Sequence, residues 1–148
     1  MELTLLGTGC PKVDYTRFGP SNLITTNKAM ILVDCGSGVT QRLNQAKISS
    51  SRIDALFLTH LHSDHVVDFY QLIISSWHSY RVRPWKVYGP KGTKKFVKKI
   101  METWKEERNQ RINYEARSST SAFKIKITEF NKYGTINIKD LKINYFEV

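Results

Sequence analysis

The stretch Thr59-His60-Leu61-His62-Ser63-Asp64-His65 holds three histidines and a carboxylate directly after an apolar run typical of a buried strand. Side chains alternate along an extended backbone, so His60 and His62 face the same side and can hold one metal ion together. The chain must then turn, and Asp64 and His65 can face a second ion from that turn. Imidazole nitrogen and carboxylate oxygen suit zinc, and also iron or manganese.

A polar loop is the alternative interpretation, with its histidines at the start of the next helix and Asp64 as the capping residue. It explains one aspartate ahead of a helix, but not three histidines in a chain that has only one other, His78. His78 falls among aromatic residues in or just past an expected helix, and we do not expect it to bind metal. The motif therefore predicts a metal site.

The rest of the chain is predicted to form one layered α/β or mixed-sheet domain. Apolar runs bounded by turn residues indicate strands, and apolar residues three or four apart indicate helices. Strands are expected at Leu3–Leu6, Leu23–Thr26, Met30–Val33, Ala55–Leu58, Trp85–Tyr88, Phe123–Phe130, Thr135–Ile138 and Leu141–Val148. Helices are expected at Val39–Ala46, at Val66–Trp77, and from Gly92 to about Arg111. The sequence stops inside the last strand pattern, so we expect a chain shortened relative to a longer design.

The net charge of +10 lies entirely in the second part of the chain. Residues 1–80 hold six Lys/Arg and six Asp/Glu, whereas residues 81–148 hold seventeen and seven. This asymmetry is typical of a protein with a polyanionic partner such as RNA, but also of a solvated helix face rich in lysine. The same alternatives, base stacking or core packing, apply to the aromatic and basic residues Trp77, Tyr80, Trp85, Trp104, Arg81, Arg83 and Lys86.

The chain carries no mark of export or membrane insertion. Cys10 and Cys35 are too few for a disulfide framework, and the N-terminus lacks the basic and apolar regions of a signal peptide. No run approaches the roughly 20 apolar residues of a membrane span. We expect a cytoplasmic protein with reduced thiols and no membrane partner.

The pattern His60, His62, Asp64 and His65 resembles the signature of the metallo-β-lactamase superfamily. The resemblance extends to the ribonuclease Z branch and its arylsulfatase-like relatives, through Leu5–Gly9, Phe18–Ser21, Asp34–Gly38, Leu58–Val67 and Val87–Pro90. It covers almost the whole chain, but only the amino-terminal half of such an enzyme. It implies an αββα sandwich in which residues 1–148 form roughly the first half, with two metal ions at one edge of two facing sheets.

The resemblance also implies a role for each site residue. His60 and His62 would hold the first ion, and Asp64 and His65 the second. Asp64 would also accept a proton from the nucleophile, which makes it the candidate catalytic residue. Asp34 would orient a ligand imidazole from behind the ligands; the alternative is an ordinary turn aspartate. Asp68, where the family usually has glycine, adds a carboxylate near the mouth of the site.

The implied activity is that of a two-metal hydrolase, with zinc first and manganese or iron as alternatives. Phosphodiester cleavage fits the positive charge best, and processing of precursor tRNA 3′ ends is its most specific version. The alternatives are a small-molecule esterase, arylsulfatase or lactonase, or an incomplete metal-binding fragment. The family uses seven ligands and this chain supplies four, so we expect it to be inactive alone. A homodimer is a further way to complete the site.

Overall fold

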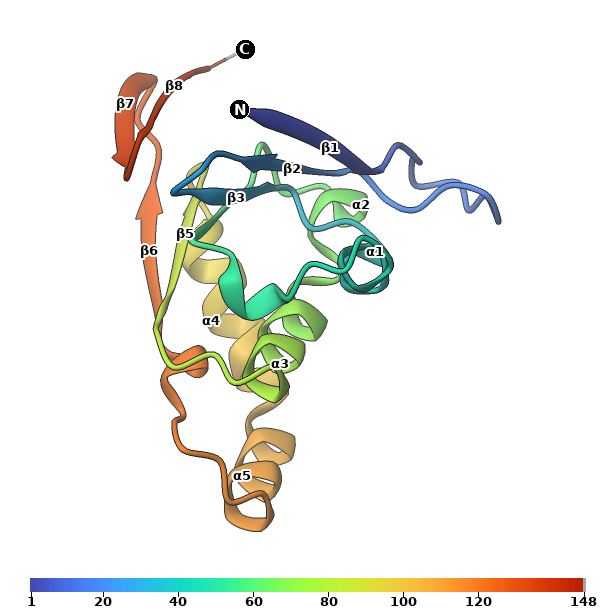
Figure 1. Cartoon of the computed structure of the whole chain (residues 1–148), viewed down its shortest axis with the longest axis vertical. Helices are drawn as coiled ribbons and strands as arrows, with labels where there is room; N and C mark the ends of the chain where they lie inside the picture. The colour runs from blue at the N-terminus through green and yellow to red at the C-terminus, as the bar shows by residue number, and fades with distance from the viewer. Residues whose placement is uncertain (148) are drawn as a thin grey trace.

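Six strands form one large sheet in sequence order, from β1 to β6 (Figure 1). The first three pair antiparallel, and β3, β4, β5 and β6 run parallel. Their bounds are β1 Glu2–Gly7, β2 Ser21–Thr25, β3 Met30–Val33, β4 Ala55–Phe57, β5 Trp85–Gly89 and β6 Ile125–Glu129. The computed structural model describes residues 1–147. The parallel order requires crossover connections, and these contain the helices.

The helices cover one face of the large sheet and enclose the main core. They are α1 Val39–Gln45, α2 Ser63–Val66, α3 Phe69–His78, α4 Thr93–Thr103 and α5 Lys105–Tyr114, with single 3₁₀ turns η1 Ser50–Arg52 and η2 Ser121–Phe123. Leu32, Leu56 and Val87 from the central strands pack with Leu43 of α1 and Leu72 of α3. Each such side chain stabilises the fold by about 1.5–3 kcal/mol when fully buried.

A separate antiparallel hairpin of β7 (Tyr133–Ile138) and β8 (Leu141–Phe146) packs on the opposite face. Its Ile138 meets Ile31, Ala55 and Phe57 of the large sheet in a second apolar cluster. Because β3 and β4 are thus covered on both faces, their sequences are continuous apolar runs. Helices, large sheet and hairpin are three successive layers, as predicted for a layered α/β fold.

The predicted helix Val66–Trp77 is wrong at its start, because two helices meet there. α2 ends at Val66, and α3 begins at Phe69 and runs to His78. At the junction, Asp68 donates its amide to the carbonyl of Cys35, outside the helix. The apolar spacing in the sequence carries no signal of this tertiary hydrogen bond. The spacing therefore predicted one continuous helix where the structure has two.

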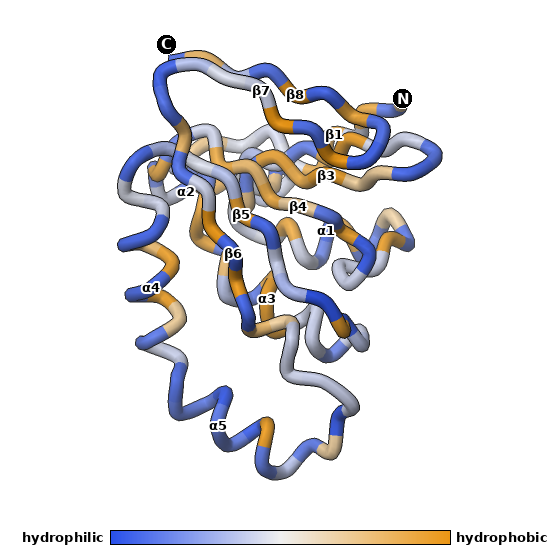
Figure 2. Tube along the Cα trace, turned by 90° about the vertical axis from the view of Figure 1, so that its left-hand side faces the viewer, coloured by the Kyte–Doolittle hydropathy of each residue, from blue (hydrophilic) through white to orange (hydrophobic). Residues whose placement is uncertain are grey.

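The predicted single helix from Gly92 to about Arg111 is also two helices. α4 ends at Thr103, and Trp104 interrupts it at φ −99° and ψ 20°, where its ring stacks on Tyr70 with 5.1 Å between centroids. Every residue of α5 remains at least partly exposed, and α5 extends away from the sheet as a mostly hydrophilic segment (Figures 1 and 2).

The remaining strand predictions hold with shifted ends. The predicted strand Phe123–Phe130 begins later, at Ile125, because Ser121–Phe123 form η2. β8 ends at Phe146, and Val148 of the predicted last strand lies outside the described residues. Both cysteines are free thiols. Within residues 1–147 every helix is too short or too polar to cross a membrane.

Base stacking by Trp77 and Trp85 is excluded, because their side chains are 1% and 0% exposed. Arg81 is buried with them and lies over the Trp85 ring, 4.0 Å from its centroid. Its guanidinium donates to the carbonyls of Ser51, Ile53, Arg83 and Pro84. Burial, aided by the nearby Arg83 charge, lowers the pKa of Arg81 to about 9. Arg81 is therefore charged at neutral pH and holds these carbonyls in place. Of the four aromatic residues considered for base stacking, Tyr80 and Trp104 are exposed.

Candidate metal centre

The histidine motif lies where the chain leaves β4 at the carboxyl edge of the parallel strands. His62 is extended, at φ −65° and ψ 147°, and α2 begins directly after it. The predicted turn is therefore present, with Asp64 and His65 in α2. The His60 ring lies 4.6 Å from that of His62 and 4.0 Å from that of His65, measured between centroids. The structure thus brings all three histidines of the motif together.

Asp34 sits behind the motif and fixes one of its rings. The buried carboxylate lies 2.8 Å, through Oδ2, from Nδ1 of His65. Asp34 Oδ1 also accepts a hydrogen bond from the Thr59 amide at 2.8 Å, and the Thr59 hydroxyl donates to both carboxylate oxygens. This arrangement keeps the Nδ1 proton of His65 toward Asp34 and leaves Nε2 free to accept a ligand.

The four predicted ligands are neighbours, but they are not a preformed ligand set. Nε2 of His65 is 3.7 Å from Oδ2 of Asp64, and Nδ1 of His60 is 3.0 Å from the Thr59 hydroxyl. Within residues 1–147 no three His, Cys, Asp or Glu side chains converge well enough to hold an ion. The donor types nonetheless fit a divalent metal, because imidazoles and a carboxylate are adjacent and one imidazole is oriented by a buried carboxylate.

Main-chain contacts hold the motif in place. The Cys35 amide donates to the carbonyl of His65 at 2.7 Å, and the Gly36 amide donates to the carbonyl of Pro20 at 3.2 Å. Gly36 has no room for a side chain, since a Cβ there would lie 2.5 Å from the Asp64 carbonyl oxygen. The turn after β3 is therefore joined to α2 and to the loop after β1.

Asp68 and His78, two polar residues outside the motif, have other partners. Asp68 accepts hydrogen bonds from the amide and hydroxyl of Thr40 in the first turn of α1. This carboxylate therefore links the start of α3 to α1. His78 ends α3, where Nδ1 faces the carbonyl of Ile74 and Nε2 lies 3.2 Å from Glu115. Thr59, which the sequence did not single out, lies within hydrogen-bond distance of both Asp34 and His60. In the sequence, only its position directly before the first histidine indicated that Thr59 could contact the site.

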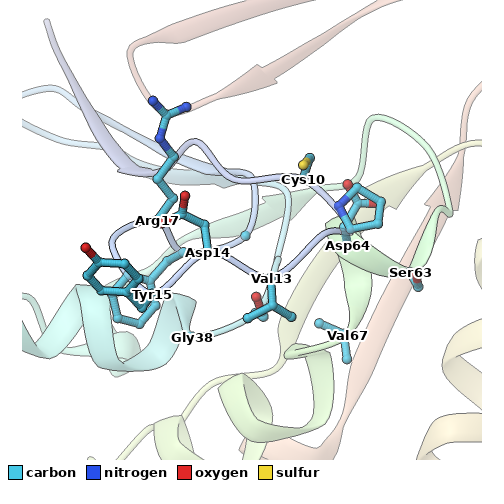
Figure 3. Close-up of a pocket in the computed structure, with 13 residues that line it drawn as sticks. Cys10, Val13, Asp14, Tyr15, Arg17, Gly38, Ser63, Asp64 and Val67 are labelled. Atoms are coloured by element: carbon cyan, nitrogen blue, oxygen red, sulfur yellow. The ribbon is translucent and has the colours of Figure 1, made fainter.

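Cavities flank the motif on two sides. One of about 390 Å³ is bordered by Asp64 and by the loop after β1, which contributes Asp14, Tyr15 and Arg17 (Figure 3). The other, of about 620 Å³, reaches from His60 to β8 and includes two lysines, Lys91 and Lys132, and aromatic side chains. The motif is therefore accessible from two sides.

The sequence profile of the family described as Anti-Pycsar protein Apyc1 matches residues 1–148. The chain belongs to the Anti-Pycsar protein Apyc1 family. This Apyc1-family chain is also similar to curated ribonuclease Z proteins. It is 40% identical over 115 residues to that of Mycolicibacterium gilvum (strain PYR-GCK), which is 76% of this chain and 40% of the relative. It is 38% identical over 119 residues to that of Mycobacterium marinum (strain ATCC BAA-535 / M), which is 78% of this chain and 43% of the relative.

Solved structures share the fold of this Apyc1-family chain. Human tRNase Z, short form, superimposes with a TM-score of 0.69 and 27% identity, over 87% of this chain and 44% of that one. YhfI, a metallo-β-lactamase fold protein of Bacillus subtilis, gives 0.67 and 18%, over 95% and 49%. The predicted metallo-β-lactamase fold and ribonuclease Z-like resemblance are confirmed. The chain spans less than half the length of the curated relatives it matches.

Proposed function

We propose that this chain carries half of the two-metal site of a hydrolase that cleaves phosphodiester bonds. The observation that carries the proposal is the cluster of three imidazoles in which Nδ1 of His65 faces the buried carboxylate of Asp34. His60 and His62 would hold one ion, and Asp64 and His65 the other. The remaining ligands would come from a longer form of the protein or from a second copy of the chain.

Two divalent ions, zinc first with manganese or iron as alternatives, would supply Lewis acidity toward the phosphodiester. The other contributions belong to residues of the chain. Asp34 and Thr59 hold the His65 ring in one orientation, which lowers the cost of ordering it. Asp64 borders a cavity and accepts the proton of the attacking water. A substrate enters through the cavities that flank the motif.

We favour a phosphodiester over a neutral ester as the substrate because the chain carries a net charge of +10. Lys91 and Lys132 line the cavity beside His60, where they would attract an anionic substrate. The similarity to ribonuclease Z makes RNA, and precursor tRNA in particular, the first substrate to test. A small ester, sulfate ester or lactone is the alternative substrate of the same site. We further propose that the protein acts in the cytoplasm.

The test compares hydrolysis of bis(p-nitrophenyl) phosphate, precursor tRNA and p-nitrophenyl acetate, with added zinc or manganese. It uses the 148-residue chain and a longer form that supplies the other ligands. We expect the longer form to cleave the phosphodiesters, and Asp64→Asn to reduce the rate about 10²–10⁴-fold through loss of the proton acceptor. His78→Gln is the matched control and should not change the rate. Hydrolysis of the acetate alone, or full activity of Asp64→Asn, would contradict the proposal.

The family name supports a second candidate, an activity directed against Pycsar. The observation in its favour is extent, because this profile matches residues 1–148 whereas the ribonuclease Z matches cover 76% and 78% of the chain. The test expresses the protein together with Pycsar and measures whether the effect of Pycsar is lost. Asp64→Asn should abolish the loss if the same site is responsible. An undiminished effect of Pycsar would remove this candidate.

A further inference from the structure

A cavity of about 280 Å³ is lined by four cationic side chains, those of Arg83, Lys86, Lys126 and Lys139, and one carboxylate, that of Asp54. Lys86 and Lys126 lie near the amino-terminal ends of β5 and β6. The histidine motif instead follows the carboxyl end of β4, which runs parallel to both. The cavity therefore belongs to the other edge of the large sheet and is separate from the candidate metal centre.

Two of the four cations are held in place by Asp54, whose side chain is 6% exposed. Arg83 donates to its Oδ1 at 2.6 Å, and Lys139 donates to its Oδ2 at 2.8 Å. The Met30 amide also donates a hydrogen bond to Oδ2, at 2.9 Å. One buried carboxylate thus neutralises one charge while positioning two, and its acceptor atoms are occupied.

The other two cations repel each other. Lys86 and Lys126 are paired directly across the parallel strands β5 and β6, so their side chains leave the same face of the sheet. Like charges in this position destabilise a sheet. Across residues 1–147, neither ammonium makes an ion pair with a carboxylate. The buried Arg81 guanidinium, which donates to the carbonyls of Arg83 and Pro84, adds positive charge behind the same cavity.

We propose that this cavity is an anion site that binds a phosphate group. Three of the four lining charges remain after Asp54 is counted, and a phosphate dianion would relieve the repulsion between Lys86 and Lys126. Lys139 also donates to the carbonyl of Lys28, and Arg83 to the carbonyls of Arg52 and Ile53. An ammonium has three donors and a guanidinium five, so one N–H of Lys139 and two of Arg83 remain for an anion. The cavity, of about 280 Å³, has room for a phosphate group.

The test is calorimetric titration of the metal-free protein, treated with EDTA and then dialysed into buffer without EDTA, using inorganic phosphate as the probe. A parallel arm uses a short single-stranded RNA without terminal phosphates, to distinguish free phosphate from the backbone of a nucleic acid. We expect one of the two probes to bind, and Lys86→Gln with Lys126→Gln to weaken that binding about tenfold or more, because charge-assisted hydrogen bonds are lost. The absence of metal separates this result from any outcome at the histidine motif.

The matched control is Lys94→Gln with Lys98→Gln, which removes the same charge from the exposed face of α4. The affinity of this variant for the probe that binds should stay within about twofold of that of the unmodified protein, since screening limits the effect of distant surface charges. A second variant, Lys86→Arg with Lys126→Arg, should bind as the unmodified protein does. No binding of either probe, or equal weakening by the two glutamine pairs, would overturn the proposal.

Discussion

Replacing Asp34 with asparagine should separate the positioning of His65 from the folding of the turn. Asp34 has a positive φ of 63°, a conformation that asparagine tolerates and alanine does not. The substitution therefore keeps the backbone and changes the carboxylate to a neutral amide. The structure defines what is lost, because Asp34 accepts from the Thr59 amide through Oδ1 and faces His65 through Oδ2.

The amide group of asparagine has one acceptor oxygen for these two partners. If the oxygen stays on the Thr59 amide, the NH₂ group faces Nδ1 of His65. The ring must then accept at Nδ1 and carry its proton at Nε2, which is the nitrogen needed for metal. We expect the affinity for zinc to fall about 10–100-fold, the usual effect of losing a partner behind a metal ligand. Loss of hydrogen bonds to a charged group should lower apo-protein stability by about 1.5–3 kcal/mol.

The assay is zinc titration against a chromophoric chelator, with urea unfolding of the metal-free protein alongside. Asp34→Ala should lose about 1–2 kcal/mol more than Asp34→Gly, because alanine is strained at positive φ. Glu106→Gln removes an exposed carboxylate from α5, away from the motif, and serves as the control for net charge. Zinc affinity of Asp34→Asn within about twofold of the unmodified protein would refute the reasoning.

Three further predictions concern the ligands, the acid response and the turn that supports the site. His60→Ala and His62→Ala should each lower the metal retained after dialysis, whereas His78→Ala should not; equal losses in all three would contradict the ligand assignment. Burial works to raise the pKa of Asp54, but hydrogen bonds from Lys139, the Met30 amide and Arg83 outweigh it, and the net pKa lies below the ordinary 3.8. The resulting stabilisation is present above about pH 4 and lost as pH falls through the folded-state value. Asp54→Asn should therefore have a lower free energy of unfolding at pH 7 and should lose less of it between pH 5 and pH 2. The measurement is urea unfolding at several pH values, and the same loss of free energy in both proteins would be inconsistent with this. Gly36→Ala should destabilise the protein by about 1–3 kcal/mol, because the new Cβ would lie 2.5 Å from the Asp64 carbonyl oxygen and from Gly19. An unchanged Tm would show that the turn yields more easily than its packing indicates.

The sequence predicted the parts of the fold that depend on local pattern. The strand before the motif and the hairpin Leu23–Thr26 with Met30–Val33 follow from apolar runs, and both are present with small shifts at their ends. The positions of His60 and His62 on an extended segment follow from the alternation of side chains. What local pattern failed to predict was the breaks near Asp68 and Trp104, where contacts distant in sequence interrupt a helical period.

The candidate site was predictable as a set of residue types, but not as a set of partners. Asp34 was expected from resemblance either to orient an imidazole or to be a turn residue, and in the structure it faces His65 from a turn. The sequence placed the carboxylate of Asp68 near the mouth of the site, but it did not predict that this carboxylate accepts hydrogen bonds from Thr40. Such choices depend on which donor lies within reach after folding. The roles of His60, His62, Asp64 and His65 as ligands stay predictions.

The backbone contacts around Gly36 bear on how this site can change over evolution. The turn after β3, the loop after β1 and α2 are joined by main-chain hydrogen bonds, such as those from the Cys35 and Gly36 amides. Substituting a histidine of the motif leaves those bonds intact. A homologue that has lost the histidines, and with them the metal, can therefore retain the same backbone around the site. Selection can then convert such a protein into a binding protein or into an enzyme for another reaction.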